Sequence, residues 1–328
     1  MPGRLALLRL LADGGFHNGA SLARGSGLPR AAVEREIDRL SAWGVEVQAR
    51  PGHGYRLPHP FDLLDEARIR AGFAAATASR VRRLTVEQEI DSTNTALLAV
   101  TDLPPGQNDV MLAEFQTAGR GRRGRAWRAP FASGLCLSVS LNLTRPHADL
   151  GTLSLAAGVA VLRALKRRGV PGLTLKWPND VLAGDAKLAG ILCELRAEPA
   201  GATYVVVGIG INVRLPAATE AALAAEGTRP TDLKRIAPGA CSRSELAAEL
   251  VNELVTMAVE FDQRGFAAYH AEWAAADALN GRAVAVHDHG GVRGGIARGI
   301  AADGTLCVEL ASGLTRLTAG DVTLRPLT

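Results

Sequence analysis

The chain has 328 residues, of which 47% are hydrophobic and 21% are charged, and its formal net charge is +4. This composition supplies enough apolar material for about two or three folded domains and argues against a disordered chain. No apolar run approaches the ~20 residues that a membrane-spanning helix needs, and no small-residue cleavage site follows the start MPGRLALLRLLADGG, so we expect a cytoplasmic protein.

The first 60 residues predict a winged helix-turn-helix. Apolar periodicity indicates helices at 5–12, 19–27 and 29–44, and the third has Pro29 in its first turn. Two short strand-like runs follow, around the turn at residues 51–54. The order helix, helix, helix, β-ribbon is typical of DNA-binding winged helices.

The charge of this segment favours DNA as its partner. Residues 1–60 hold eight arginines against five acidic residues, although three of those acids lie on the third helix. We expect base contacts from the first turn of that helix and phosphate contacts from its arginines; the candidates are Pro29, Arg30 and Arg35. The alternative is a module that docks onto another protein and never touches DNA.

The middle of the chain predicts a mixed sheet with helices. Pro58 and Pro60 mark a boundary, and a helix through 62–76 enters the next domain. Strand-like runs lie at 84–90, 109–116, 133–143, 173–180, 181–197 and 203–213, and helices are expected at 92–100, 151–168, 242–264 and 266–279. Ser242 and Glu245 form a capping box at the start of the third of these helices.

The tail predicts five short strands with glycine turns, arranged as a small β-barrel. The expected fold class is therefore α+β, with three domains: a winged helix at 1–60, a mixed-sheet catalytic domain at 61–279 and a barrel at 280–328.

The stretch GRGRRGRAW, residues 119–127, satisfies GxGxxG but is a weak dinucleotide signal. A dinucleotide site needs a helix directly after the glycines, whereas Pro130 and an alternating strand pattern follow here. What remains is a glycine-rich connection between strands, whose arginines suit phosphate or carboxylate groups. The alternative is a solvated basic surface loop.

A second cluster lies in LKWPNDVLAGDAKLAG. Its spacing could bring Lys176 and Lys187 near Asp180, and lysines beside the Asn179-Asp180 pair suit an anionic substrate with Mg²⁺. The alternative is a type I turn without function, which Pro, Asn and Asp favour.

Other candidate sites have little support. The run His287-Asp288-His289 lacks a third metal ligand and is expected to be an exposed turn. No GxSxG or HExxH motif is present. The four cysteines form no CxxC pair and are expected to be buried, reduced thiols: Cys136, Cys193, Cys241 and Cys307.

Five motifs in order behind a winged helix resemble the bifunctional biotin–protein ligase and biotin-operon repressor family. They are DSTN (91–94), EFQTAGRGRRGRAW (114–127), KWPND (176–180), KLAGIL (187–192) and GIGIN (208–212). The resemblance covers nearly the whole chain and implies an SH3-like form for the C-terminal barrel.

The resemblance implies a two-step ligation. Biotin and MgATP would give biotinyl-5′-AMP and pyrophosphate, and a lysine of the biotin carboxyl carrier protein of acetyl-CoA carboxylase would then displace AMP. It also implies that the adenylate-loaded protein forms a homodimer through its central sheet and represses transcription at operator DNA.

The resemblance assigns roles to the motif residues. Biotin would be bound by Ser92, Thr93, Asn94, Gln116, Arg120, Gly121, Arg122 and Lys187. The nucleotide would be bound by Arg125, Trp127, Lys176, Asn179 and Asn212. Lys187 is the first choice for catalysis, with Arg122 and Asp180, and Asp180 is the candidate Mg²⁺ ligand.

Three other functions remain open. The chain could be a ligand-sensing DNA-binding regulator that has lost catalysis, a lipoate-type protein ligase, or a ligase whose N-terminal module does not bind DNA. The intact arginine stretch and Lys187 argue against the first, and the pair KWPND with GRGRRGRAW argues against the second.

Overall fold

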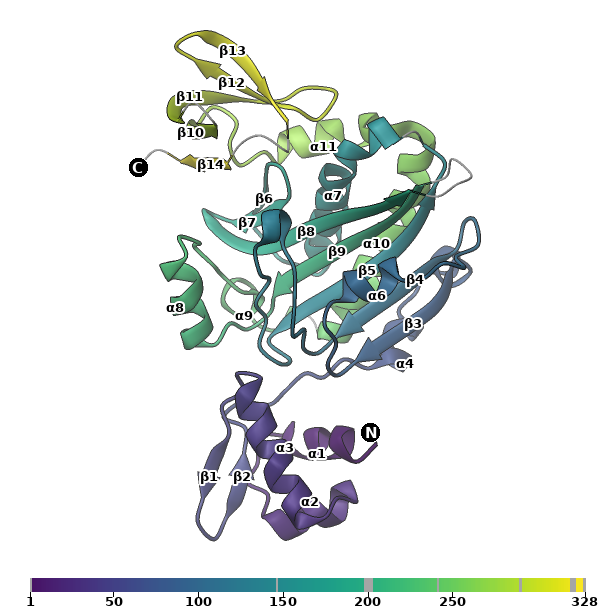
Figure 1. Ribbon diagram of the computed structural model, residues 1–328, viewed down its shortest axis with the longest axis vertical. Coiled ribbons are helices and arrows are strands. Elements are labelled where there is room, and N and C mark those ends of the chain that lie inside the picture. The colour runs from purple at the N-terminus through teal and green to yellow at the C-terminus, as the bar shows by residue number, and fades with distance from the viewer. Residues whose placement is uncertain are drawn as a thin grey trace.

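Three structural units follow one another in the computed structural model, from the purple N-terminal helices to the yellow C-terminal strands (Figure 1). It describes residues 2–145, 147–197, 203–240, 242–288, 291–318 and 323–326. No helix in these ranges has the length and apolar character needed to cross a membrane.

The N-terminal unit is the expected winged helix. Its elements are α1 Pro2–Leu11, α2 Gly19–Ser26, α3 Arg30–Ala42, β1 Gln48–Arg50 and β2 Gly54–Arg56, the two strands being antiparallel. Asn18 caps α2 by accepting from the Ser21 amide at 2.8 Å, which satisfies one of the free N–H groups of the first turn. Val33, Ile37 and Leu40 form the buried face of α3, as its periodicity predicts.

Trp43, directly after α3, joins this unit to the central domain. Its ring stacks on Phe115 and Phe131, with centroid distances of 5.5 and 5.1 Å. The Phe131 amide donates to the Trp43 carbonyl at 3.3 Å. Phe115 and Phe131 flank the arginine-rich stretch, so the end of α3 packs against both of its stems.

The central domain is built on a seven-stranded sheet of order β3-β4-β5-β9-β8-β7-β6 (Figure 1). The pair β3–β4 is parallel and every other neighbouring pair is antiparallel. The strands are β3 Val81–Glu87, β4 Asn108–Ala113, β5 Gly134–Leu143, β6 Leu173–Lys176, β7 Asp180–Ala183, β8 Ala186–Ala197 and β9 Thr203–Asn212.

Helices cover the two faces of this sheet differently. The long helices α7 Leu153–Arg167 and α10 Arg243–Arg264 pack on one face and bury most of the core, whereas the short α6 Thr93–Leu98 lies on the other (Figure 1). The predicted capping box opens α10, with Ser242 and Glu245 each accepting from the other's amide.

Two predicted helices are divided. The segment 62–76 forms α4 Glu66–Ala71 and then α5 Ala75–Ala78, because the Asn252 side chain bonds the Gly72 carbonyl and the Ala74 amide between them. The segment 266–279 forms a 3₁₀ turn, Gly265–Ala268, and then α11 His270–Ala275. The helices α8 Ala217–Ala225 and α9 Leu233–Ile236 were not predicted.

The C-terminal unit is an antiparallel sheet of order β13-β12-β11-β10-β14. Its strands are β10 Ala283–Asp288, β11 Gly291–Ile300, β12 Leu306–Leu310, β13 Gly313–Leu317 and β14 Thr323–Pro326. The predicted strands are confirmed, but β13 and β14 lie at opposite edges with no pairing between them in the described residues, so no closed barrel is found. His287 and Asp288 end β10, and His289 lies outside the described residues.

The C-terminal unit contacts two turns of the central domain. Trp177 Nε1 donates to the Gly304 carbonyl at 3.0 Å, and Arg282 pairs with Asp185 at 2.8 Å. The first contact holds the KWPND turn and the second holds the β7–β8 turn, which precedes Lys187.

Candidate active site

The stretch 119–127 folds as a short hairpin above the sheet. The Trp127 amide donates to the Gly119 carbonyl at 2.9 Å, and the Gly121 amide donates to the Arg125 carbonyl at 2.7 Å. A 3₁₀ turn, Arg122–Gly124, forms the tip, where Arg123 and Gly124 both have positive φ. The hairpin therefore presents arginines from a fixed backbone toward two different parts of the sheet.

One part is a polar network at the start of α6. Ser92 caps this helix, and Thr93 donates to Gln116 Oε1 from its amide at 2.8 Å and from its hydroxyl at 3.1 Å. The Asn94 carbonyl oxygen accepts from Ser138 Oγ at 2.6 Å. Ser92, Thr93 and Asn94 are all buried, and the contacts of Thr93 bring the DSTN segment and Gln116 together.

Two members of this network were not predicted, Ser138 on β5 and Glu194 on β8. Glu194 Oε2 accepts from Asn94 Nδ2 at 2.8 Å and from Arg120 at 2.9 Å. Ser138 stands in an apolar strand and Glu194 alternates with apolar neighbours, so neither belongs to a local motif. Only the pairing of β5, β9 and β8 brings them beside α6.

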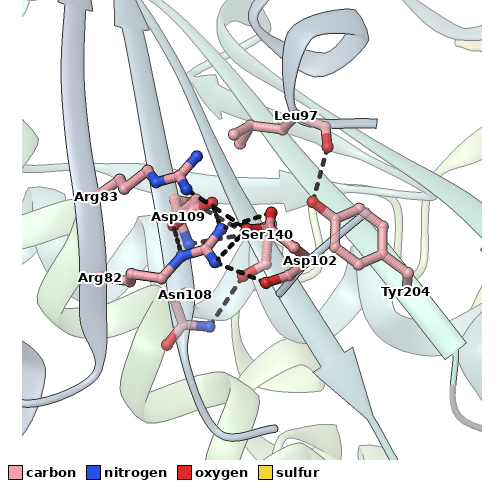
Figure 2. Close-up of polar contacts among 8 residues, drawn as sticks. All are labelled: Arg82, Arg83, Leu97, Asp102, Asn108, Asp109, Ser140 and Tyr204. Atoms are coloured by element: carbon pink, nitrogen blue, oxygen red, sulfur yellow. Dashed lines mark hydrogen bonds and ion pairs between the residues drawn. The ribbon is translucent and has the colours of Figure 1, made fainter. Parts of the chain in front are cut away.

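The far end of α6 is held by separate polar contacts (Figure 2). Tyr204 Oη donates to the Leu97 carbonyl at 2.7 Å, while Arg82 makes two bonds to Asp109, at 2.9 and 2.6 Å, and one to the Asp102 carbonyl at 2.6 Å. Asp109 and then Asp102 raise the pKa of Arg82. These contacts attach the end of α6 and the loop after it to the sheet. They therefore help to hold the helix, including its buried first turn, in place.

The second part of the site lies around Lys187, at the start of β8. Its ammonium is 2.7 Å from Asp180 Oδ1. Its amide donates to the Arg229 carbonyl at 2.7 Å, and its carbonyl accepts from the Thr231 amide at 2.9 Å. Asn212 Nδ2 donates to the Thr231 carbonyl at 3.0 Å, so its observed contacts support the segment beside Lys187.

The KWPND turn connects this part to the hairpin. Lys176 ends β6 opposite Asp180 in the ladder, and Asn179 Nδ2 donates to the Ile191 carbonyl at 2.8 Å. Arg122 donates to Asn179 Oδ1 at 3.3 Å. Burial, followed by the charge of Arg123, lowers the pKa of Arg122, so an anion beside its guanidinium would offset part of the cost of burying that cation.

Trp127 lies on two glycines of the sheet. A Cβ at Gly210 would be 2.3 Å from its ring and a Cβ at Gly190 would be 3.4 Å from it, and Lys187 Nζ is 5.9 Å from the ring centroid. Trp127 therefore lies beside Lys187, against the part of the sheet where Gly190 and Gly210 have no side chains. Arg125 is exposed at the end of the hairpin tip.

The three candidate DNA contacts lie on the outer surface of the winged helix. Pro29 caps α3, and Arg30 and Arg35 are exposed on it. Arg30 lies 3.9 Å from Glu34, a loose exposed pair that leaves the guanidinium accessible.

The cysteines in the described residues are free thiols, as expected, but only Cys136 is fully buried, whereas Cys193 and Cys307 are partly buried. Burial raises the pKa of Cys136 to about 11 and that of Cys193 to about 12. They therefore remain protonated near neutral pH and are poor nucleophiles. Cys241 lies outside the described residues.

The hairpin lies between a polar network at the start of α6 and a group of cations around Lys187. The network contains hydrogen-bond donors and acceptors of the kind that recognise a polar ring, and Lys187 and Arg122 carry positive charge that suits a carboxylate or phosphate.

Comparison with known proteins identifies family matches in three segments of the chain. Residues 86–212 match the Biotin/lipoate A/B protein ligase family, 4–56 match an HTH domain, and 280–325 match the Biotin protein ligase C terminal domain. The bifunctional ligase/repressor BirA of Salmonella typhimurium is 36% identical over 323 residues, which are 98% of this chain and 97% of that protein.

Two further relatives cover less of the chain. The biotin--[acetyl-CoA-carboxylase] ligase of Mycobacterium tuberculosis is 38% identical over 79% of this chain and 95% of its own length. The structure of the biotin protein ligase from Aquifex aeolicus in complex with biotin and ATP superimposes with a TM-score of 0.61, at 26% identity, over 75% of this chain and all of that one. The chain therefore belongs to the bifunctional ligase/repressor family of biotin protein ligases.

Proposed function

We propose that this protein is a biotin–[biotin carboxyl carrier protein] ligase that also represses transcription. The observation that carries the proposal is the hairpin 119–127, which contacts the polar network through Arg120 and Glu194, and the KWPND turn through Arg122 and Asn179. The polar network suits the ureido ring of biotin, and the cations Lys187 and Arg122 suit its carboxylate.

In the first step the biotin carboxylate oxygen attacks the α-phosphate of ATP, the bond to the bridging oxygen breaks, and pyrophosphate leaves. Lys187 and Arg122 are suited to hold the carboxylate and the phosphate oxygens, because charge accumulates there in the transition state. In the second step the carrier lysine amine attacks the acyl carbon, AMP leaves, and the amine gives up a proton.

The remaining site residues have proposed roles that follow the family motifs. Ser92, Thr93, Asn94 and Gln116 bind the ring, and Gly121 lets the hairpin backbone approach it. Trp127 stacks on adenine, Arg125 lies near the phosphate, and Lys176, Asn179 and Asn212 support the nucleotide.

Mg²⁺ enters with ATP and would neutralise phosphate charge. In the described residues no group of three His, Cys, Asp or Glu side chains could hold a metal by itself. One carboxylate together with phosphate oxygens is the usual arrangement for Mg²⁺, and Asp180 fits that part. Because Asp180 pairs with Lys187, the same carboxylate would then be shared between the ion and the lysine.

A homodimer of the adenylate-loaded protein is proposed to form through the central sheet. Beyond Ile191, β9 is the strand neighbour of β8 in the described residues, which makes this part of β8 a candidate for contact with a second copy. The same part of β8 is a candidate surface for the carrier domain. Leu195 is a large apolar side chain exposed on this strand.

Three further points complete the proposal. We propose domain limits of 1–60, 61–279 and 280–328, and we propose that the five-stranded C-terminal sheet is of the SH3-like type, although its edge strands β13 and β14 are not paired in the described residues. The cytoplasm is the proposed location, because ATP, free biotin and operator DNA occur there together.

Mass spectrometry of a carrier domain after incubation with the protein, biotin and MgATP tests the ligation. We expect the mass gain of one biotinyl group on a lysine. No gain and no pyrophosphate release would favour a regulator without catalysis. Preferential use of lipoate in competition would favour a lipoate-type ligase, whose dithiolane ring offers no counterpart to the hydrogen bonds of Thr93, Asn94 and Gln116.

A mobility-shift assay with DNA upstream of the biotin genes, with and without biotinyl-5′-AMP, tests repression. Arg30→Glu and Arg35→Glu should weaken operator binding, because each replaces a positive charge facing phosphate with a negative one. Arg264→Glu, on the surface of α10, is the control and should bind as the wild type does. Unchanged operator binding in all three variants would indicate that α3 does not contact the DNA through Arg30 and Arg35.

A further inference from the structure

Glu194 connects two parts of the site that come from distant segments of the chain. Its Oε2 atom accepts from Asn94 Nδ2 at 2.8 Å, on the ring side, and from the Arg120 guanidinium at 2.9 Å, on the hairpin. Both donors therefore converge on one carboxylate oxygen. No motif contains Glu194, and none of the roles proposed above uses it.

The carboxylate determines which way the Asn94 amide points. An ionised carboxylate only accepts hydrogen bonds, so the amide nitrogen must face Glu194, and Asn94 Oδ1 is then turned to Ser138 Oγ at 2.6 Å. The Leu192 carbonyl, 3.2 Å from the same amide nitrogen, favours the same orientation. Behind the amide there is no space, since a Cβ at Gly208 would lie 2.2 Å from Asn94 Oδ1.

The same carboxylate fixes one end of the hairpin. Arg120 lies on its first strand, and Glu194 is the partner that holds this arginine against the sheet; the two side chains are 40% and 24% exposed. Two other contacts of the hairpin, Arg122 with Asn179 and Trp127 with Gly190 and Gly210, lie on the side of Lys187. Without Glu194, the ring side of the hairpin would lose its charged attachment.

We propose that Glu194 is a positioning residue that keeps the hairpin closed over the ring and orients Asn94, so that biotin and biotinyl-AMP are retained until the carrier lysine arrives. This role rests on the proposed ligase function. Retention matters because the acyl-adenylate is a mixed anhydride, and release into water leads to its loss by hydrolysis.

The test compares full-length variants Glu194→Gln, Glu194→Ala, Arg120→Ala and the double variant Glu194→Ala/Arg120→Ala. Each protein is loaded with biotin and MgATP, and the dissociation rate of labelled biotinyl-AMP is measured in a chase. Biotin KM, single-turnover adenylation and thermal unfolding are measured on the same samples. Glu309→Gln is the matched control, since Glu309 pairs with Arg298 on the C-terminal sheet, away from the site.

We expect Glu194→Gln and Glu194→Ala to release the adenylate about 5- to 20-fold faster, the loss expected for a partly exposed charge-assisted bond. Biotin KM should rise with little change in single-turnover adenylation. The double variant should release the adenylate about as fast as the single variants do. Its change in activation free energy should be much smaller than the sum of the two single changes, because the two residues act through one contact. Glu309→Gln should match the wild type in every measurement.

Wild-type release rates in both Glu194 variants would overturn the role, and so would additive effects in the double variant. A wild-type protein that forms no adenylate would instead contradict the proposed function, and this role with it. The two failures are distinguishable because adenylate formation by the wild type is measured first.

Discussion

Lys187 is fixed through its backbone as well as through its charge. Its amide and carbonyl are bonded to Arg229 and Thr231, and Asn212 Nδ2 reaches its carbonyl at 3.4 Å. The ion pair with Asp180 then directs the ammonium. A substitution at Lys187 should therefore remove the charge without displacing β8, which makes its kinetic effect interpretable.

Lys187→Ala is predicted to slow adenylate formation by at least about 10²-fold, because a preorganised cation next to the reacting phosphate is lost. Single-turnover pyrophosphate release, with biotin and MgATP saturating, measures this step alone. Lys166→Ala, on the exposed last turn of α7, is the control and should react at the wild-type rate. A near wild-type rate for Lys187→Ala would remove it from the catalytic step.

Cys136 and Cys193 are predicted to resist alkylation in the native protein. Burial raises their pKa values to about 11 and about 12, so the reactive thiolate is scarce at pH 8. Peptide mapping after iodoacetamide treatment should find both unmodified until denaturant is added. Because the folded state holds these protons more firmly, the free energy of unfolding should also decline as pH rises above about 9 toward these values. Rapid native labelling at pH 8 would show that the thiols are accessible.

At the scale of elements, β9 explains the motif GIGIN. Ile209 and Ile211 face the core, whereas Gly208 and Gly210 face the site, where Asn94 and Trp127 occupy the space that a side chain would need. The alternation follows directly from the period of a strand. The isoleucines of this motif thus pack in the core, and its glycines leave room for the side chains of Asn94 and Trp127 on the opposite face.

Gly208→Ala is predicted to raise the Kd for biotin at least about 10-fold, since the new Cβ would displace the Asn94 amide from its network. Isothermal titration calorimetry measures the affinity. Gly158→Ala is the matched control: it has room in the middle of α7, 3.5 Å from Leu175, and should leave biotin binding unchanged. Its free energy of unfolding should rise by roughly 0.5–1 kcal/mol, the helix preference of alanine over glycine. Unaltered biotin affinity in Gly208→Ala would mean that Asn94 does not bind the ring.

The elements with strong local signals were predictable from sequence. Periodicity and Pro29 located the winged helix, and Ser242 with Glu245 located α10. The helix α8 was missed because its alanine-rich sequence has no buried face and so shows no amphipathic period. The sequence also does not indicate whether the C-terminal strands close into a barrel. Alternating hydrophobicity identifies strands, but it does not show whether the two edge strands pair with each other.

The site was predictable only where a motif carries it. Spacing suggested that Lys187 approaches Asp180, and their side chains meet across a register shift between β7 and β8. Ser138 and Glu194 were missed because their contacts with Asn94 join segments about 44 and 100 residues apart. Such contacts depend on strand order, which local patterns do not encode.

At the scale of the whole molecule, the junction at Trp43 links the hairpin 119–127 to the end of α3. Its ring lies against Phe115 and Phe131, one on each side of the hairpin. Next to Phe115, buried Glu114 pairs with Arg243 at 2.6 Å and accepts from the Leu64 amide in the linker at 2.6 Å. A change in the hairpin is therefore placed to reach both the end of α3 and the linker.

The ratio of operator affinities with and without biotinyl-AMP is predicted to be about 2- to 10-fold smaller in Phe115→Leu than in the wild type. This factor corresponds to the energy that an aromatic pair contributes in addition to its buried area. Leucine keeps apolar volume at this partly buried position, so the fold should persist. Operator affinity is measured by fluorescence anisotropy with and without adenylate, at protein concentrations that hold the dimer fraction equal. Because coupling between two binding equilibria is reciprocal, operator DNA should also raise the affinity for biotinyl-AMP less in the variant, by the same factor in Kd. Phe266→Leu, buried against α10 and remote from Trp43, is the control for loss of an aromatic ring. Equal coupling in Phe115→Leu and the wild type would show that the contact between Trp43 and Phe115 does not transmit the ligand state to α3.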